Sequence, residues 1–372
     1  MGGHFSSLLT AQEPRGNRIP VTVLTGFLGS GKTTLLNRLL RQPDLQGTAV
    51  IVNEFGEVGI DHDLIAQTTE DTILLANGCV CCAVRGDLVE ALNRLGERTD
   101  PPLRHVLIET SGLADPGPIL RTLMGDTAIR ARFVLAGVAC TVDAVLGMGT
   151  LDRHPESVRQ VAVADHLFLT KADLLESVQA SQALLERLQQ LNGMARMHLD
   201  RDQQPMVLRQ LVQAPTRADA EPPEGLLYRP LPGASQATAD ALAPRHRDGI
   251  TSFVLVRDVP LPREAFSAWL DMVIAMRGED LLRVKGLVNL VEQPDRPLVI
   301  HGVQHLFHPP EVLDAWPGPD RRTRIVFITR GVDADAMGQT LDVLVRRHLR
   351  KTPASATSNA TTTDSSKTQE TK

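Results

Sequence analysis

The order of apolar and polar positions divides the chain into two parts. From Ile19 to about Ala214, short apolar runs of strand length alternate with segments of helical period, which is typical of a parallel sheet with helices on its faces. The predicted strands are Val21 to Leu24, Ala49 to Asn53, Thr72 to Leu75, His105 to Glu109, Phe133 to Val142 and His166 to Thr170. The predicted helices are Lys32 to Arg41, Leu88 to Glu97, Ile119 to Met124 and Ser181 to Leu191.

The second part follows a segment without sustained period. Residues 215–244 carry Pro, Gly, Ala and mixed charge, which predicts a linker, and a second domain is expected over residues 245–350. Its order predicts a small antiparallel sheet covered on one face by two helices. The expected strands are Ile250 to Arg257, Leu281 to Val291, Leu298 to Leu306 and Arg324 to Thr329, and the expected helices are Arg263 to Met276 and Ala334 to Arg347.

Both ends of the chain are expected to lack a packed structure. Residues 1–18 are predicted to be a flexible N-terminus without a signal peptide. Residues 351–372 are mostly Thr, Ser, Ala, Asn and charged residues, and such a tail buries too little apolar surface to offset its ordering entropy, so we expect it to be disordered.

Composition narrows the class of protein. A chain of 372 residues with 42% apolar residues exceeds what one hydrophobic core usually serves, which favours two domains. The net charge of −5 and the aromatic content of 3% argue against a nucleic-acid binder. No run approaches the roughly 18 apolar residues of a membrane helix. We therefore expect neither a nucleic-acid nor a membrane partner. The positions of the four cysteines do not suit a disulfide framework, so we expect a cytoplasmic protein.

A phosphate-binding loop follows the first predicted strand. The segment from Gly26 to Thr33 reads GFLGSGKT, which matches the P-loop pattern at the start of an amphipathic helix. Its glycines let backbone N–H groups surround the phosphates, Lys32 reaches the β and γ oxygens, and the Thr33 hydroxyl is offered to Mg²⁺. The predicted nucleotide-binding residues here are Gly26, Gly29, Ser30, Gly31, Lys32, Thr33 and Thr34. This predicts an α/β fold, with a P-loop NTPase domain over residues 19–214, a mainly parallel sheet, and a smaller α+β C-terminal domain.

A second strand ends in a carboxylate. The apolar run Val106 to Ile108 is followed by Glu109 and then, after two polar residues, by Gly112. Glu109 is predicted to hold the Mg²⁺ shell or orient the attacking water, and the Gly112 amide to sense the γ-phosphate. We therefore assign catalytic roles to Lys32, Glu109 and Gly112, and magnesium to Thr33 and Glu109. A solvated residue or a helix cap is the alternative for Glu109.

The segment Thr170, Lys171, Ala172 and Asp173 follows the last strand predicted for the sheet. Guanine-specific P-loop proteins place their base-reading loop there. The Asp173 carboxylate can accept hydrogen bonds from guanine N1 and the exocyclic amine, while the Lys171 stem packs along the base. Adenine lacks that pair of donors, so GTP is favoured over ATP. GTPases normally begin this motif with Asn, and Thr170 is a departure.

Three of the four cysteines fall in one short loop. Cys79, Cys81 and Cys82 lie between a predicted strand and a predicted helix, on the nucleotide side of the sheet. Thiolates bind soft or borderline metals such as Zn²⁺ and Cu(I). The sequence has no second Cys or His knuckle, so the coordination sphere is incomplete and suits an ion that is passed on. Buried structural thiols and a redox pair are the alternatives, and Cys140 is predicted to be a core residue.

An acidic loop with glycines follows the second predicted strand. Asn53, Glu54, Glu57 and Asp61 belong to it, and a nucleotide-sensing switch loop is expected at this place in the fold. Its carboxylates could meet Mg²⁺ or a transferred ion. A solvated acidic loop without a role is the alternative.

These motifs together resemble the CobW-type metallochaperone GTPases, which include the zinc-regulated GTPase metalloprotein activators. The resemblance also covers Leu282 to Gly286, which reads LRVKG, in the C-terminal domain. It implies that GTP hydrolysis is coupled to delivery of a metal, most often zinc, to a client metalloprotein, with the ion held at the Cys-x-Cys-Cys motif. Many relatives carry a His-rich loop that concentrates metal, and this linker has none, which favours delivery over storage. The sequence leaves the oligomer open between monomer and homodimer.

Other functions remain open at this point. A cobalt or iron chaperone for cobalamin synthesis or nitrile hydratase belongs to the same family. A P-loop kinase and a nucleotide-gated scaffold without metal transfer are alternatives from other classes. His301, His305 and His308 are expected to be ordinary polar surface, because His301 and His305 are too far apart along a strand to share one ion.

Overall fold

The computed structural model describes residues 4–10, 18–41, 47–53, 72–74, 83–98, 102–175, 178–199 and 249–351. Its first domain is built on a sheet of seven parallel strands in the order β3-β2-β4-β1-β5-β6-β7. The strands are β1 (Ile19–Gly26), β2 (Thr48–Asn53), β3 (Thr72–Leu74), β4 (His105–Thr110), β5 (Phe133–Asp143), β6 (His166–Thr170) and β7 (Arg196–Leu199). Because the strands are parallel, their carboxyl ends share one edge of the sheet.

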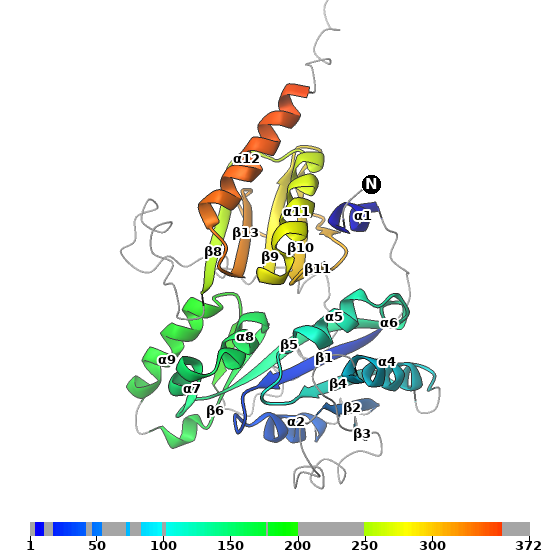
Figure 1. Ribbon diagram of the computed structural model, residues 1–372, viewed down its shortest axis with the longest axis vertical. Helices are drawn as coiled ribbons and strands as arrows, with labels where there is room; N and C mark the ends of the chain where they lie inside the picture. Colours follow the sequence, from blue (N-terminus) through cyan, green and yellow to red (C-terminus); the bar gives the residue numbers. More distant parts are fainter. Residues whose placement is uncertain are drawn as a thin grey trace, which may run out of the picture.

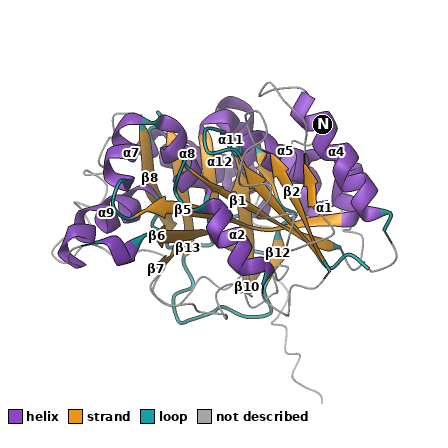
Figure 2. Ribbon diagram, turned by 90° about the horizontal axis from the view of Figure 1, so that it is seen from below, coloured by secondary structure: helices purple, strands orange, loops and turns teal. Residues whose placement is uncertain are grey.

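Helices cover both faces of this sheet (Figure 2). On one face, Leu35, Leu36 and Leu39 of α2 pack on strand residues such as Leu24 and Val50. The opposite face carries two apolar clusters that involve α4, α5, α6, α8 and α9. The helices are α2 (Lys32–Leu40), α4 (Ala83–Gly96), α5 (Gly117–Gly125), α6 (Thr127–Arg132), α7 (Gly147–Arg153), α8 (Pro155–Val163) and α9 (Val178–Leu191), with a 3-10 turn η2 (Ala172–Leu174).

The C-terminal domain is an antiparallel sheet in the order β11-β10-β9-β13-β8, and β12 pairs with β10. The helices α11 and α12 cover one face, where Phe266, Trp269 and Leu341 pack against Phe327 and its neighbours. The elements are β8 (Ile250–Arg257), α11 (Arg263–Arg277), η3 (Gly278–Asp280), β9 (Leu281–Leu290), β10 (Gln293–Val303), β11 (Leu306–Phe307), β12 (Glu311–Val312), β13 (Thr323–Arg330) and α12 (Ala334–Lys351). The predicted fold class, a P-loop domain with a parallel sheet and a smaller α+β domain, is confirmed.

The C-terminal domain lies against the helices of the P-loop domain (Figure 1), and the two domains share two apolar clusters along this seam. Val303 and Leu306 of the C-terminal domain join the cluster that contains α4, α5 and α6. Ile250, Leu282 and Ile328 join the cluster that contains α8 and α9. The C-terminal domain therefore rests on the same helical layer that covers the parallel sheet.

The N-terminal segment corrects one expectation. Residues 1–18 were predicted to be flexible, yet α1 (His4–Thr10) packs on α11, beside which Figure 1 shows it. Phe5 is fully buried, and its ring makes edge contacts with Phe266 and Phe307 at centroid distances of 5.9 and 5.7 Å. The Phe5 amide donates to Asp271 Oδ1 at 2.6 Å. The residues that hold this helix are 261 to 302 positions away along the chain, so no local sequence pattern predicts its docking.

Other differences are smaller. The sequence interpretation missed β7, α6, α7 and α8, and it ended the sheet at β6, whereas β7 pairs with β6 beyond it. The predicted linker lies outside the described residues, as does the predicted tail after Lys351, the residue that ends α12. Among the helices of the described residues, none has the length and apolar character that crossing a membrane requires.

Candidate functional site

The P-loop links the end of β1 to the start of α2. Gly26, Gly29 and Gly31 have φ values of 142°, 70° and 91°, in the left-handed region where glycine carries no steric penalty. A Cβ on Gly26 would lie 2.2 Å from Thr141 Oγ1, so glycine is also required by the close approach of β5. The Lys32 ammonium donates to the carbonyl oxygens of Gly26 and Phe27 at 3.0 and 3.3 Å. The loop therefore holds its ammonium group at the mouth of a backbone cradle suited to phosphate.

The proposed magnesium residues lie side by side. Thr33 Oγ1 donates to Glu109 Oε1 at 3.1 Å. Glu109 is the last but one residue of β4 and lies opposite Leu24 of β1, the strand that leads into the P-loop. A hydroxyl and a carboxylate at this spacing are oxygen ligands of the kind Mg²⁺ takes in P-loop proteins. The two residues present therefore fit the ion.

Gly112, in the turn after β4, lies against Leu28 of the P-loop. A Cβ at this position would lie 2.7 Å from the Leu28 amide nitrogen, so only glycine lets the two segments come this close. The side-chain amide of Gln160, in α8, donates to the carbonyl oxygens of Gly112 and Ala114 at 3.1 and 3.0 Å. The Gly112 turn is thus fixed beside the phosphate cradle, as a role near the γ-phosphate requires.

The segment predicted to read guanine also meets the P-loop. Thr170 Oγ1 donates to the Ser30 carbonyl at 2.7 Å, which ties the end of β6 to the P-loop. Lys171 has φ 58° and its ammonium pairs with Asp143 Oδ2 at 2.7 Å, while Asp173 is exposed. Strand pairing explains this pair, since Asp143 ends β5 opposite Thr170.

Comparison with known families decides the membership of the chain. A family model described as the CobW/HypB/UreG nucleotide-binding domain matches residues 20–199, and one described as the cobalamin synthesis protein CobW C-terminal domain matches residues 250–345. The chain belongs to the CobW family. The predicted resemblance is therefore confirmed.

Named relatives and a solved structure agree with this membership. The CobW-family chain is 33% identical over 300 residues to the zinc chaperone YjiA of Escherichia coli, covering 78% of this chain and 88% of that protein. It is 31% identical over 203 residues to the zinc-regulated GTPase metalloprotein activator 1 of Saccharomyces cerevisiae, covering 48% and 47%. The crystal structure of Zn(II)-bound YjiA GTPase superposes with a TM-score of 0.61 at 26% identity, over 88% of this chain and 99% of that one.

Part of the predicted site lies outside the described residues. Cys79, Cys81 and Cys82, and Glu54, Glu57 and Asp61 of the predicted switch loop, belong to this part. Asn53 is the last residue of β2 and lies opposite Thr110 of β4. Cys140 is buried in β5 as predicted, and burial raises the pKa of its thiol to about 12.

Sequence reasoning missed Asp143 and Gln160. Burial would raise the pKa of Asp143, but the Lys171 ammonium and the backbone amides of Leu146 and Val145 hold it below its ordinary value. A carboxylate after a long apolar strand next to β1 is a signal that could have identified Asp143. A lone glutamine in a helix carries no such signal, and Gln160 becomes visible only through its contact with the Gly112 turn.

The histidines of the C-terminal domain correct another expectation. His301 and His308 were predicted to be ordinary polar surface, yet their rings pack together at a centroid distance of 4.7 Å, and burial lowers the pKa of both. Strand alternation predicts which face His301 occupies, but it does not reveal that another domain covers that face. His305 lies apart from the pair, in the turn between β10 and β11.

Proposed function

We propose that this protein is a GTP-hydrolysing metallochaperone that binds zinc at Cys79, Cys81 and Cys82 and transfers it to a client metalloprotein. The observation that supports the nucleotide part is the meeting of the P-loop, Glu109, Gly112 and the Thr170 segment at one edge of the sheet. The names of the relatives support the zinc part.

The chemistry assigned to each residue follows from its position. Lys32 and the P-loop amides neutralise the phosphate charge, and Thr33 with Glu109 would hold Mg²⁺, which supplies further charge neutralisation when bound. The close approach of Gly112 to the Leu28 backbone supports a role for the Gly112 amide in sensing the γ-phosphate. Asp173 is exposed beside the paired Lys171, which leaves its carboxylate accessible to the donors of guanine.

The topology supports placing the metal near the nucleotide. β3 ends at Leu74 and α4 begins at Ala83, so the cysteine loop connects the carboxyl end of a parallel strand to the next helix. The P-loop and Asn53 also follow carboxyl ends of strands in this sheet. A change in the Asn53 to Asp61 segment between GTP and GDP could then alter metal binding, and hydrolysis would release the ion to a client docked partly on the C-terminal domain.

The decisive experiment combines metal analysis with GTPase assays under anaerobic, reducing conditions. We expect Cys81→Ala with Cys82→Ala to lose bound zinc and the response of GTP hydrolysis to zinc. Cys140→Ala is the matched control, because this cysteine lies in the core and should leave both properties unchanged. Unchanged zinc stoichiometry in the double variant would refute the metal assignment.

Three further measurements separate the alternatives. Competition between zinc and cobalt should favour zinc at thiolates, and the reverse order would support the cobalt carrier. Steady GTP hydrolysis without a phosphorylated product excludes the kinase. Asp173→Ala should lower the affinity for GTP and leave the weaker affinity for ATP unchanged, which tests the guanine assignment independently of the metal.

A further inference from the structure

Gln160 is a buried amide in α8 that contacts the turn after β4. Its side chain is fully buried, and its amide nitrogen donates to the Gly112 and Ala114 carbonyl oxygens at 3.1 and 3.0 Å. Its oxygen Oε1 is buried and has no hydrogen-bond partner among the described residues. An apolar side chain of the same length would fill this space without a buried unpaired oxygen, which is destabilising. The two hydrogen bonds from the amide nitrogen are therefore what Gln160 adds to the fold.

The Gly112 turn needs such bonds to keep one orientation. Glycine has no Cβ, so the peptide groups on both sides of Gly112 rotate at little steric cost. The turn is closed by a hydrogen bond from the Ala114 amide to the Ser111 carbonyl at 3.0 Å. The bonds from Gln160 hold two of its carbonyl groups toward α8. They therefore restrict how the Gly112 backbone lies relative to Leu28 of the P-loop.

The helix that carries Gln160 is anchored at both ends. At its amino end, the ring of His154 stacks on the ring of Phe27 in the P-loop, with the ring centroids 4.4 Å apart. At its carboxyl end, the side-chain amide of Asn192 donates to three backbone carbonyl oxygens at distances of 2.8 to 3.2 Å. Gln160 thus reaches the Gly112 turn from a helix that is tied to the P-loop itself.

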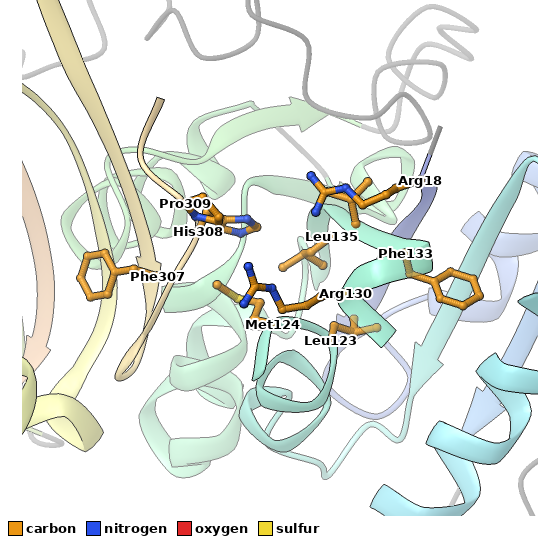
Figure 3. A pocket seen from close by; sticks show the side chains of 10 residues that line it. Arg18, Leu123, Met124, Arg130, Phe133, Leu135, Phe307, His308 and Pro309 are labelled. Atoms are coloured by element: carbon orange, nitrogen blue, oxygen red, sulfur yellow. The ribbon is translucent and has the colours of Figure 1, made fainter. Parts of the chain in front are cut away.

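The C-terminal domain provides a third anchor, just beyond the end of α8. Asp165 follows this helix and accepts hydrogen bonds from Arg283 and Lys285 of β9. The Arg283 side chain is only 1% exposed, so these residues form a buried ion cluster at the seam. The domains also pack closely, since the gap that Arg130 and His308 line between them (Figure 3) has a volume of about 20 Å³, the space of roughly one water molecule.

We propose that Gln160 is a positioning residue for the nucleotide reaction, which directs the Gly112 amide toward the γ-phosphate by holding the turn against the P-loop. A donor that is ordered before the substrate binds stabilises a phosphate oxygen without the entropy loss of ordering a glycine turn. GDP has no γ-phosphate, so the contribution of Gln160 is confined to GTP and its hydrolysis. This inference rests on the proposed function, in which Gly112 senses the γ-phosphate, and deepens it.

The test compares GTP with GDP on the full-length protein in the presence of Mg²⁺. Gln160→Met keeps the length of the side chain and removes both hydrogen bonds. We expect about tenfold lower affinity for a non-hydrolysable GTP analogue, unchanged affinity for GDP, and a kcat for GTP hydrolysis that is lower by roughly tenfold to a hundredfold. Both affinities are measured on one preparation, so an unfolded fraction lowers both equally and leaves their ratio unchanged.

Asn289→Leu is the matched control. Asn289, in β9 of the C-terminal domain, is also a buried amide that donates to a backbone carbonyl, that of Arg321 at 2.7 Å, and its oxygen also has no partner among the described residues. This substitution should lower the thermal midpoint and leave the ratio of affinities and kcat unchanged. Gln160→Glu is a second variant of nearly the same size that can donate at most one of the two hydrogen bonds, so its ratio should also fall.

Three results would overturn the inference. One is a Gln160→Met variant with the affinity ratio and kcat of the wild type. Another is an equal fall in the affinities for GDP and the GTP analogue, which would assign Gln160 to general support of the P-loop. The third is an equal change of the ratio in Asn289→Leu, which would reduce the effect to lost stability.

The wild-type protein separates this inference from the proposed function. Hydrolysis of GTP without any bound zinc would refute the metal part of the proposed function and leave the role of Gln160 intact. A wild-type protein that neither binds nor hydrolyses GTP would refute both.

Discussion

Replacing Asp165 by Asn removes the negative charge that faces two cations of the C-terminal domain. The substitution keeps the size of the side chain and an acceptor oxygen for the Val138 amide, so the lost charge is the main change. Burial alone would raise the pKa of Asp165, but the charges of Arg283 and Lys285 hold it well below its ordinary value. Asp165 is therefore ionised at neutral pH.

The expected loss of stability comes from the buried Arg283 charge that the substitution leaves unpaired. Arg283 is 1% exposed, so without Asp165 it would be a buried charge with no carboxylate partner among the described residues. Breaking a buried pair by removing one partner costs about 3–5 kcal/mol. With a urea slope of about 2 kcal/mol per molar, the unfolding midpoint should fall by roughly 1.5–2.5 M. Both tryptophans, Trp269 and Trp316, lie in the C-terminal domain, so their fluorescence reports this transition.

Asp320→Asn is the matched control. Asp320 also meets two arginines, Arg322 and Arg324, but it is 31% exposed, and exposed ion pairs contribute about 0–1 kcal/mol. The pH dependence gives a second test. Because the folded pKa of Asp165 lies below the unfolded value of about 3.9, its stabilisation is complete above that value and is lost as pH falls through the folded pKa. A loss for Asp165→Asn no larger than for Asp320→Asn would refute a buried ion cluster at the seam.

Three other substitutions test separate parts of the structure. Thr170→Val removes the hydroxyl that bonds the Ser30 carbonyl, and a loss of about 1 kcal/mol should weaken GDP binding roughly fivefold in calorimetry, whereas unchanged affinity would contradict this contact. Phe5→Ala should destabilise the C-terminal domain by about 3–5 kcal/mol in urea unfolding, and a neutral effect would mean that α1 is undocked in solution. In a variant with Cys79, Cys81 and Cys82 changed to Ser, a thiol reagent should modify Cys140 only after denaturation, because its pKa is about 12 and its side chain is buried.

The parallel sheet could be predicted because its central strands are continuous apolar runs, buried on both faces. β7 was missed since Arg196–Leu199 is short and lies at the half-exposed edge of the sheet. The pair α7 and α8 was missed because α7 is short and contains two glycines, and because α8 begins at Pro155, with only one residue between the two helices. The pattern of apolar residues therefore predicted the buried strands. It did not predict elements that are too short or too exposed to show a clear hydrophobic period.

The sequence predicted more of the nucleotide site than of the contact between the two domains. The P-loop, Glu109 and Gly112 follow a motif whose spacing fixes their geometry, and the structure brings them together. The roles of Asp165, His301 and His308 depend on which surface of one domain meets the other, and no spacing along the chain encodes that. The zinc ligands and the switch loop remain predictions, since they lie outside the described residues.

The docking of α1 has a consequence for the order in which the protein folds during synthesis. Phe5 and Asp271, whose carboxylate accepts the hydrogen bond from the Phe5 amide, are separated by 266 positions. At about 5–20 residues per second, roughly 13–50 seconds pass between the synthesis of these two residues. Throughout that interval the apolar face of α1 has no surface to cover it, while the P-loop domain can already form. A chaperone that shields the nascent chain, or a slow release from the ribosome, would therefore affect α1 more than any other helix described in the chain.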